Sequence, residues 1–312
     1  MNTILLNMIH VAVVLTVPPL LLGVINKTKA WFAGRRGPPV LQPYYDLRKL
    51  IVKGSVFSET TTWVFRFGPV VGLATALVAA AIIPLGQRDA PLSFVGDMIL
   101  FAYVLSLGRF FTMAAALDTG SAFEGMGSAR EATYGCLAEP VLLFGLLVLA
   151  KVSMMAGVSE SLSMNGMLGE SLTKEWSVAG ASMLLVLISW FIVLLVENSR
   201  IPFDDPNTHL ELTMIHEVMV LDHCGPALAM ILYGAAVRLF IFAALVVRLA
   251  IPLQSGFALW NWGLFLVGVL AVAVGVGIVE SIMARLRLTV IPNLLVGAGV
   301  LVAFGLVLVL SH

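Results

Sequence analysis

Long stretches without charged side chains constrain this sequence more than any other feature. A helix needs about 20 mostly apolar residues to cross the hydrocarbon core of a membrane. Windows of at least that length without Asp, Glu, Lys or Arg cover residues 1–26, 67–87, 176–196, 249–279 and 288–312. Three further apolar stretches each carry one interior charge, at Arg109, Glu139 or Arg238. Only 12% of the residues are charged, against about 25% in an ordinary soluble domain, so the sequence predicts a membrane protein.

The windows predict an all-α integral membrane protein with about eight transmembrane helices. The expected spans are residues 3–26, 66–87, 97–117, 131–151, 176–197, 225–247, 256–280 and 288–310. No internal repeat or low-complexity segment divides them, so we expect a single transmembrane domain over residues 1–312. The first span lacks the basic segment and the cleavage site of a signal peptide, and we expect it to be retained as a helix.

Charge and cysteine content exclude several classes of function. The formal net charge is zero, with 18 basic and 18 acidic residues, so no global field attracts nucleic acid. Cys136 and Cys224 have no spacing typical of an iron–sulfur or zinc site, and we expect no metal and no cofactor in this chain. No phosphate-binding glycine loop or nucleophile elbow is present, so no catalytic residue is expected either.

Lysine and arginine are distributed unevenly between the two sets of loops. The loops after the first, third, fifth and seventh spans, with their edges, hold twelve basic residues, and the alternate loops hold three. Basic residues accumulate in cytoplasmic loops. We therefore expect the first set of loops to lie in the cytoplasm and both termini to lie on the outer side.

Two polar connections differ from ordinary loops. In the first, glycines and paired prolines over residues 34–39 predict a turn, and residues 42–53 alternate apolar and charged side chains at helical spacing. We expect an amphipathic helix there, lying in the membrane interface of the first cytoplasmic loop. The second connection, residues 198–223, places five carboxylates and three histidines among apolar residues, which indicates a polar surface or cavity.

The three histidines of the second connection, His209, His216 and His223, repeat every seven residues. On a continuous helix they would share one face, with about 10 Å between neighbours. Two of them would then be too far apart to bind one metal ion. Satisfied polar side chains or a protonation relay remain as interpretations.

Four carboxylates lie within or at the ends of expected spans: Glu131, Glu139, Glu197 and Glu280. Ionisable side chains at these depths mark an ion pathway or a paired structural site. Glu139 is the deepest, about two helical turns beyond Glu131. A desolvated carboxyl group can exchange protons near neutral pH, which favours a proton relay. Neutralisation by Arg109, Arg238 or Lys151 is the alternative.

Four segments, in order along the chain, resemble one protein family. Residues 34–50, GRRGPPVLQPYYDLRKL, and residues 197–212, ENSRIPFDDPNTHLEL, resemble two loop motifs of subunit 1 of respiratory complex I. Residues 117–140 and 280–288 resemble the branch found in complex-I-like nickel–iron hydrogenases, the group 4 enzymes of the energy-converting or formate hydrogenlyase type. Asn207 and His209 stand at two positions where the complex I loop carries acidic residues. This difference favours the hydrogenase branch.

This resemblance implies an eight-helix subunit of the cytoplasmic (inner) membrane of a prokaryote, which docks a cytoplasmic redox arm and couples electron transfer to proton or ion translocation. The implied partners are the hydrogenase large subunit, its iron–sulfur small subunit, antiporter-like membrane subunits and the lipid bilayer. Iron–sulfur clusters and a nickel–iron centre are expected in partner subunits. The expected docking residues are Arg35, Arg36, Asp46, Lys49 and Arg200. The expected proton-pathway and coupling residues are Glu131, Glu139, Glu197, Asp204, Glu211, Glu217 and Glu280.

Three other functions stay open at this point. The chain could contribute the quinone site of a NADH dehydrogenase-like complex, or it could be a passive membrane anchor with structural acids. A stand-alone cation transporter would need a midplane site in broken helices and usually inverted repeats, and neither is evident in the sequence.

Overall fold

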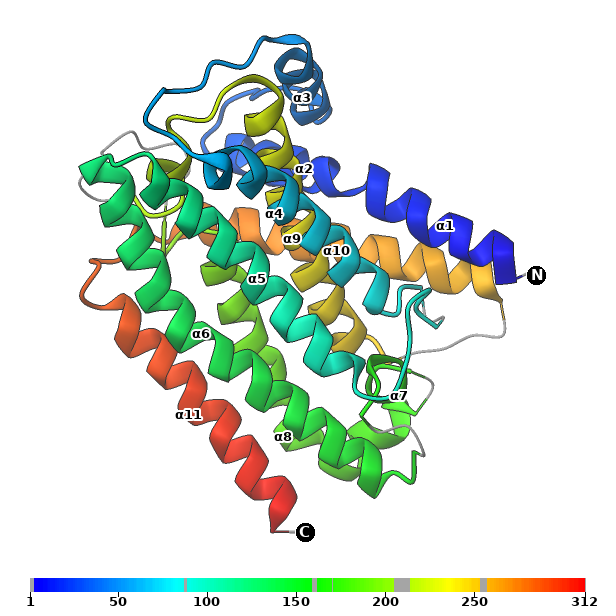
Figure 1. The fold of residues 1–312 in the computed structure, drawn as a ribbon. Helices are drawn as coiled ribbons and strands as arrows, with labels where there is room; N and C mark the ends of the chain where they lie inside the picture. The colour runs from blue at the N-terminus through cyan, green and yellow to red at the C-terminus, as the bar shows by residue number, and fades with distance from the viewer. Residues whose placement is uncertain are drawn as a thin grey trace.

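The computed structural model describes residues 3–86, 89–158, 162–169, 171–204, 214–252 and 257–311. All regular elements within these ranges are helices (Figure 1). The helices long and apolar enough to cross a membrane are α4 (Trp63–Ile82), α5 (Asp97–Asp118), α6 (Ala122–Met155), α8 (Leu172–Glu197), α9 (Gly225–Ala250), α10 (Ala258–Ile282) and α11 (Ile291–Leu310). Helices α1 (Thr3–Thr16) and α2 (Pro18–Phe32) meet at a bend of 45° and are together long and apolar enough to form an eighth span. The predicted all-α class with about eight spans is confirmed.

The bend divides a span that the sequence led us to expect as one helix over residues 3–26. Pro18 and Pro19 lack the backbone N–H that would continue the helical hydrogen bonds, so the preceding carbonyls lose their partners. The hydroxyl of Tyr233 donates to the Leu15 carbonyl at 2.8 Å, and the hydroxyl of Tyr44 donates to the carbonyl of Thr16. Side chains of α9 and of the first loop thus satisfy the broken helix end.

The amphipathic helix expected over residues 42–53 is α3 (Gln42–Val52), and none of its residues is buried. Figure 1 shows α3 at the upper end of the molecule, above α2 and α9. Two short elements complete the fold: α7 (Met164–Met167) and the 3-10 helix η1 (Glu217–Val220).

Helix α9 forms the centre of the bundle. Every residue from 239 to 249 is buried, and a helix that is buried on all sides needs apolar side chains all round. The only charged residue in that stretch, Arg248, donates to the carbonyl of Leu168 at the end away from α3. Helix α11 lies beside α6 at the edge of the bundle (Figure 1).

The loops gather at two ends in the order expected for alternating spans. At one end, the Thr62 N–H donates to Asp118 at 2.7 Å, and the Leu286 N–H donates to the Pro202 carbonyl at 2.8 Å. These bonds join loops that follow odd-numbered spans. At the other end, the Ala90 N–H donates to Asn165 at 2.9 Å. The predicted grouping of loops is therefore observed, whereas the side of the membrane that each group faces stays a prediction.

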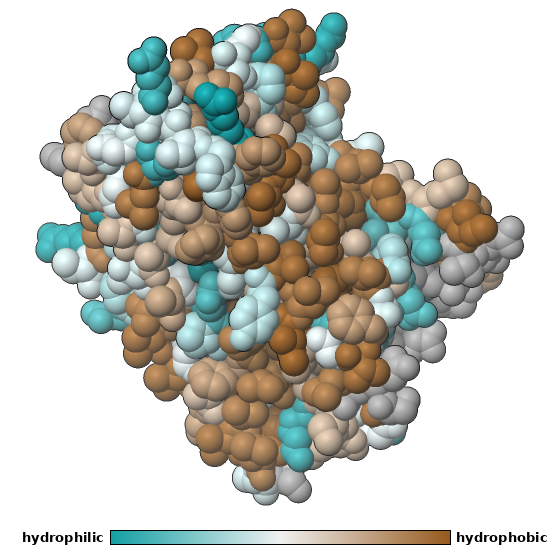
Figure 2. All heavy atoms as spheres, in the orientation of Figure 1, coloured by the Kyte–Doolittle hydropathy of each residue, from teal (hydrophilic) through white to brown (hydrophobic). Residues whose placement is uncertain are grey.

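The surface of the molecule has the polarity expected of a protein within a bilayer. Figure 2 shows hydrophobic side chains over much of the central and lower face, with hydrophilic ones gathered around α3 and the neighbouring loops. A small hydrophilic patch interrupts the hydrophobic surface between α5 and α6. This patch lies beside the charged cluster described next.

Candidate functional site

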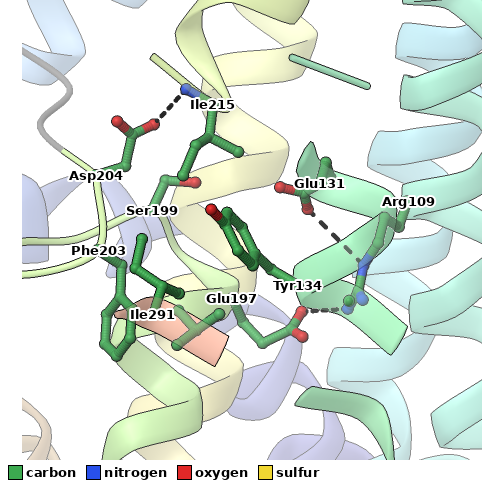
Figure 3. A pocket seen from close by; sticks show the side chains of 11 residues that line it. Arg109, Glu131, Tyr134, Glu197, Ser199, Phe203, Asp204, Ile215 and Ile291 are labelled. Carbon is green, nitrogen blue, oxygen red and sulfur yellow. Dashed lines mark hydrogen bonds and ion pairs between the residues drawn. The ribbon is translucent and has the colours of Figure 1, made fainter. Parts of the chain in front are cut away.

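A single arginine draws three of the predicted carboxylates together. Arg109 of α5 is 6% exposed, and its guanidinium lies 2.5 Å from Glu197, 3.3 Å from Glu139 and 3.8 Å from Glu131. Figure 3 shows the pairs with Glu131 and Glu197. We call these four residues the Arg109 cluster. The structure therefore brings together acids of α6 and α8 that are far apart in sequence.

The sequence of α6 is shaped to receive this arginine. Glu131, Gly135 and Glu139 are spaced by four residues, so they lie along one face of the helix. A Cβ atom at Gly135 would lie 2.1 Å from Nη1 of Arg109, which is inside any contact distance. Glycine is thus required for the guanidinium to lie against α6, with one glutamate a turn away on either side.

The Arg109 cluster carries more negative than positive charge. Arg238 of α9 adds a second positive charge close to Glu131 and Glu197. Three carboxylates and two guanidiniums leave one negative charge in excess. An uncompensated charge is costly away from water, and Glu139, the most exposed of the three acids, is the one that solvent can reach. Ion pairing of these acids is therefore observed, whereas the proton relay stays a prediction.

A second charged group lies where the loops meet. Glu280, at the end of α10 and 5% exposed, pairs with Lys29 at 2.8 Å and with Arg200 at 3.5 Å. Asp204 pairs with Arg285 at 2.8 Å. It also accepts the backbone N–H groups of residues 215 and 216, at 3.0 and 3.1 Å. These contacts fasten the connections before α9 and before α11 to one another.

Three cavities link the two charged groups to the flank of the bundle. The loop cavity, of about 280 Å³, lies between α2, α3 and α9 and is lined by Arg200, Asp204 and Glu217 among others. The connecting cavity, of about 10 Å³, is lined by Asp204 at one end and by Glu131 and Glu197 at the other. The lateral groove, of about 500 Å³, lies between α5 and α6 and contains Glu139.

The cavities share lining residues, so they lie in series. Asp204 lines both the loop cavity and the connecting cavity, and Arg109 lines both the connecting cavity and the lateral groove. Figure 3 shows Tyr134 between Asp204 on one side and Glu131 and Glu197 on the other. The connecting cavity has about the volume and the polar lining that one water molecule requires. A water molecule there would lie between the loop carboxylate and the Arg109 cluster.

Glu139 lies in a different environment from the one its sequence position suggests. It is the deepest of the four acids along the chain, yet its side chain is 38% exposed, because it faces the lateral groove on the flank of the bundle. The hydroxyl of Ser106 donates to its carboxylate at 2.8 Å. Depth along a span is therefore not the same as enclosure by protein. Lys151, considered as a partner, forms no ion pair with these acids in the described part of the chain.

Of the three histidines of the second connection, the two that the structure describes, His216 and His223, do not share a helix face. His216 precedes η1, and His223 follows it in a turn, stacked on Phe65 with ring centroids 3.9 Å apart. Burial, together with the nearby charges of Arg238 and Arg200, lowers the pKa of His216 to about 3. Burial also lowers the pKa of His223 to about 4. Both are neutral near pH 7, which disfavours the protonation relay and favours polar side chains of the fold.

The remaining predicted residues lie mainly in the loop cavity and at the end of α2. Arg200, Asp46 and Glu217 line the loop cavity, whereas Arg35 and Arg36 lie at the end of α2 against α10. Lys49 is exposed on α3, and Glu211 and His209 lie outside the described residues. Within those residues, no group of three or more His, Cys, Asp or Glu side chains is placed to hold a metal ion.

Sequence reasoning left four contributors to the site unassigned. Lys29 and Arg285 supply the cations for Glu280 and Asp204. Ser106 supplies a hydroxyl to Glu139, and Tyr134 lines the connecting cavity while its hydroxyl donates to the Leu288 carbonyl. Lys29 was visible only as one of many basic residues near a span end. No pattern in the sequence indicated that it meets a residue 251 positions away.

Comparison with known proteins agrees with this architecture. The family model described as NADH dehydrogenase matches residues 4–311. Formate hydrogenlyase subunit 4 of Escherichia coli (strain K12) is 31% identical over 299 residues, which cover 94% of each chain. Hydrogenase-4 component C of the same organism is 31% identical over 287 residues, 90% of this chain and 88% of the relative.

More distant similarity extends to respiratory complexes. NADH-ubiquinone oxidoreductase chain 1 of Mycosarcoma maydis is 28% identical over 263 residues, which cover 78% of this chain and 75% of that relative. A chain in the solved structure of the membrane-bound sulfane sulfur reductase, an archaeal respiratory membrane complex, has the same fold. Its TM-score is 0.82 at 21% identity, and the match covers 98% of this chain and 99% of that one. With a family match over nearly its whole length and a helical fold of seven or eight candidate spans, this multi-pass membrane protein belongs to the NADH dehydrogenase subunit 1 family.

Proposed function

We propose that this chain is the membrane-arm subunit of a complex-I-like nickel–iron hydrogenase or related oxidoreductase, where it docks the redox arm and couples electron transfer to proton or ion translocation. The observation that carries the proposal is the series of three cavities, in which ionisable side chains lead from the loop end to the flank. The similarity to subunits of formate hydrogenlyase and hydrogenase-4 supports the hydrogenase branch.

Coupling requires that a change of charge at the loop end be felt at the Arg109 cluster. Two unit charges interact with about 4 kcal/mol at 4 Å and about 1 kcal/mol at 15 Å, at an effective dielectric constant of 20. Energies in that range change proton occupancy by a factor between about five and about a thousand. Redox chemistry that alters charge near Asp204 would therefore shift a proton among Glu131, Glu139 and Glu197, with the connecting cavity as the route between them.

The two ends of this series fit different partners. The loop end, with Asp46, Lys49 and Arg200, would receive the hydrogenase large and small subunits, which would carry the iron–sulfur clusters and the nickel–iron centre. The lateral groove would receive an antiporter-like membrane subunit, because Glu139 exposes a carboxylate there on an otherwise apolar flank. In this arrangement the loop end faces the cytoplasm of a prokaryote, and both termini lie on the outer side of the inner membrane.

The loop cavity supports a second candidate, a quinone-site subunit. Its walls combine apolar residues of α2 and α9, such as Leu22 and Ile231, with Asp46 and Arg200. That combination suits an amphipathic ligand with a polar ring. Quinone reduction by membranes that contain the intact complex would favour this candidate, and hydrogen evolution without quinone reduction would favour the hydrogenase.

Substitution of Glu139 by glutamine tests the coupling proposal. Glutamine keeps the size and the hydrogen-bonding capacity of the side chain but cannot carry a proton. In the intact complex in proteoliposomes, Glu139→Gln should retain electron transfer to a soluble dye at the redox arm and lose most of the proton gradient. Because Glu139 is partly exposed, its replacement should cost little stability. The exposed Glu59, replaced in the same way, serves as the matched control.

The result can also contradict the proposal. An undiminished gradient in an assembled Glu139→Gln complex would remove the lateral groove from the pathway. If every single replacement of Glu131, Glu139 and Glu197 left the gradient intact, the chain would be a passive anchor.

A further inference from the structure

A basic hollow lies apart from the cavities of the coupling pathway, between the end of α2 and the flank of α10. It has a volume of about 470 Å³, and we call it the α2–α10 hollow. Three cations line it: Lys27, Arg35 and Arg36. The other walls include Trp31, Val274 and Ile278. No carboxylate is among the lining residues, and none of the three cations forms an ion pair within the described ranges of the chain.

The end of α2 is folded so that the three cations converge. The Gly34 N–H donates to the Trp31 carbonyl at 3.0 Å, and the Arg35 N–H donates to the Ala30 carbonyl at 2.8 Å. This pair of backbone hydrogen bonds ends a helix when the glycine that follows it takes a left-handed conformation. Gly34 has that conformation, with φ +65°. The ammonium group of Lys27 also donates to the Arg36 carbonyl at 2.7 Å. This hydrogen bond holds the turn that contains Arg36 against α2, the helix that carries Lys27.

The apolar walls of the hollow are open to the outside. Trp31 is 77% exposed and Val274 is 38% exposed. Helices α2 and α10 pack tightly beside the hollow, since a Cβ at Gly277 would lie 2.8 Å from Cβ of Thr28. Apolar side chains on spans that face outward contact acyl chains, and tryptophan is enriched where the acyl region meets the headgroups. The hollow therefore combines an apolar wall at the membrane surface with a positively charged mouth.

We propose that the α2–α10 hollow binds an anionic phospholipid, with the headgroup phosphate among the three cations and an acyl chain along Trp31 and Val274. Basic pockets beside transmembrane helices hold anionic headgroups in this way, and arginine recognises phosphate by paired hydrogen bonds. A soluble phosphate would leave the apolar wall uncovered. The proposal does not depend on the coupling function, and it gives Arg35 and Arg36 a lipid ligand in place of the redox arm.

Lipid retention by the purified complex tests this proposal. The complex would be delipidated in detergent and titrated with phosphatidylglycerol, with phosphatidylcholine of the same acyl chains, and with inorganic phosphate, while bound lipid is counted by native mass spectrometry. The Arg35→Gln/Arg36→Gln variant should bind phosphatidylglycerol about 25-fold more weakly, if each cation contributes roughly fivefold. The Arg48→Gln/Lys53→Gln variant, which removes two exposed cations of the same loop outside the hollow, should bind it as the unmodified chain does.

A second variant keeps the proposal testable if the charge variant fails to assemble. Val274→Trp fills the apolar wall without a change of charge, and it should reduce retention of phosphatidylglycerol. Equal retention of phosphatidylglycerol by the unmodified complex and the Arg35/Arg36 variant would overturn the proposal. Full competition of inorganic phosphate with the lipid at equal concentration would also overturn it. The same holds if the Arg35/Arg36 variant releases the redox arm while its lipid retention is unchanged.

Discussion

Replacement of Gly135 by alanine is the sharpest probe of the Arg109 cluster. The added Cβ would lie 2.1 Å from Nη1, 3.1 Å from Cζ and 3.2 Å from Cδ of Arg109. The clash therefore involves the body of the side chain as well as its tip, and a small rotation of the guanidinium cannot relieve it. Arg109 also lines the lateral groove, so the clash would displace its side chain from its present position among the three carboxylates.

The expected cost follows from the ion pairs that a displaced Arg109 would lose. Its pairs with Glu197 at 2.5 Å and Glu139 at 3.3 Å would be stretched or broken. Separation of a buried ion pair typically destabilises a protein by about 3–5 kcal/mol. We expect Gly135→Ala to lose that much stability in thermal or denaturant unfolding of the purified complex, together with most of the proton gradient.

A matched glycine and a double-mutant cycle make this prediction refutable. Gly263 of α10 has no heavy atom within 4 Å of an added Cβ, so Gly263→Ala should be neutral or stabilise by up to about 1 kcal/mol. In an Arg109→Gln background the cost of Gly135→Ala should be much smaller, because the two residues act through one contact. Full stability of Gly135→Ala, or additive costs in the cycle, would refute the geometry of the cluster.

Two further predictions concern the histidines and the orientation. His216 and His223 have pKa values of about 3 and about 4, below the ordinary 6.5. Their contribution to the free energy of unfolding is therefore complete above about pH 6.5. It is lost as the pH falls toward those pKa values, by about 1.4 kcal/mol per pH unit for each histidine. Denaturant unfolding between pH 7 and 4 should show this fall, and a His216→Gln/His223→Gln variant should flatten it; an equal slope in both proteins would contradict the assignment. Single cysteines at Ser55 and Ser311, in a background without Cys136 and Cys224, should react with impermeant thiol reagents from the cytoplasmic and the outer side respectively. Reaction of the Ser55 cysteine from outside would reverse the orientation and the docking model.

Some features of this protein were accessible from local sequence alone. Hydropathy located the spans because a bilayer requires about 20 apolar residues in a row, wherever those residues later pack. Helical periodicity located α3 in the same way, since an amphipathic pattern needs no information from distant residues. Loop motifs indicated the family. Pro18 and Pro19 were also visible in the sequence, but a span predicted from the absence of charged residues gave no sign that the helix breaks there.

Only the tertiary structure decided which charges meet. Glu131, Gly135 and Glu139 share a face of α6 by spacing alone, yet Arg109 reaches that face because α5 packs beside α6. Glu280 meets Lys29 because α10 packs against α2. Which helices become neighbours depends on the summed packing of whole helix faces, whereas hydropathy and periodicity describe one helix at a time. The pairing of charges, the exposure of Glu139 and the cavities in series therefore follow from the three-dimensional arrangement of the spans.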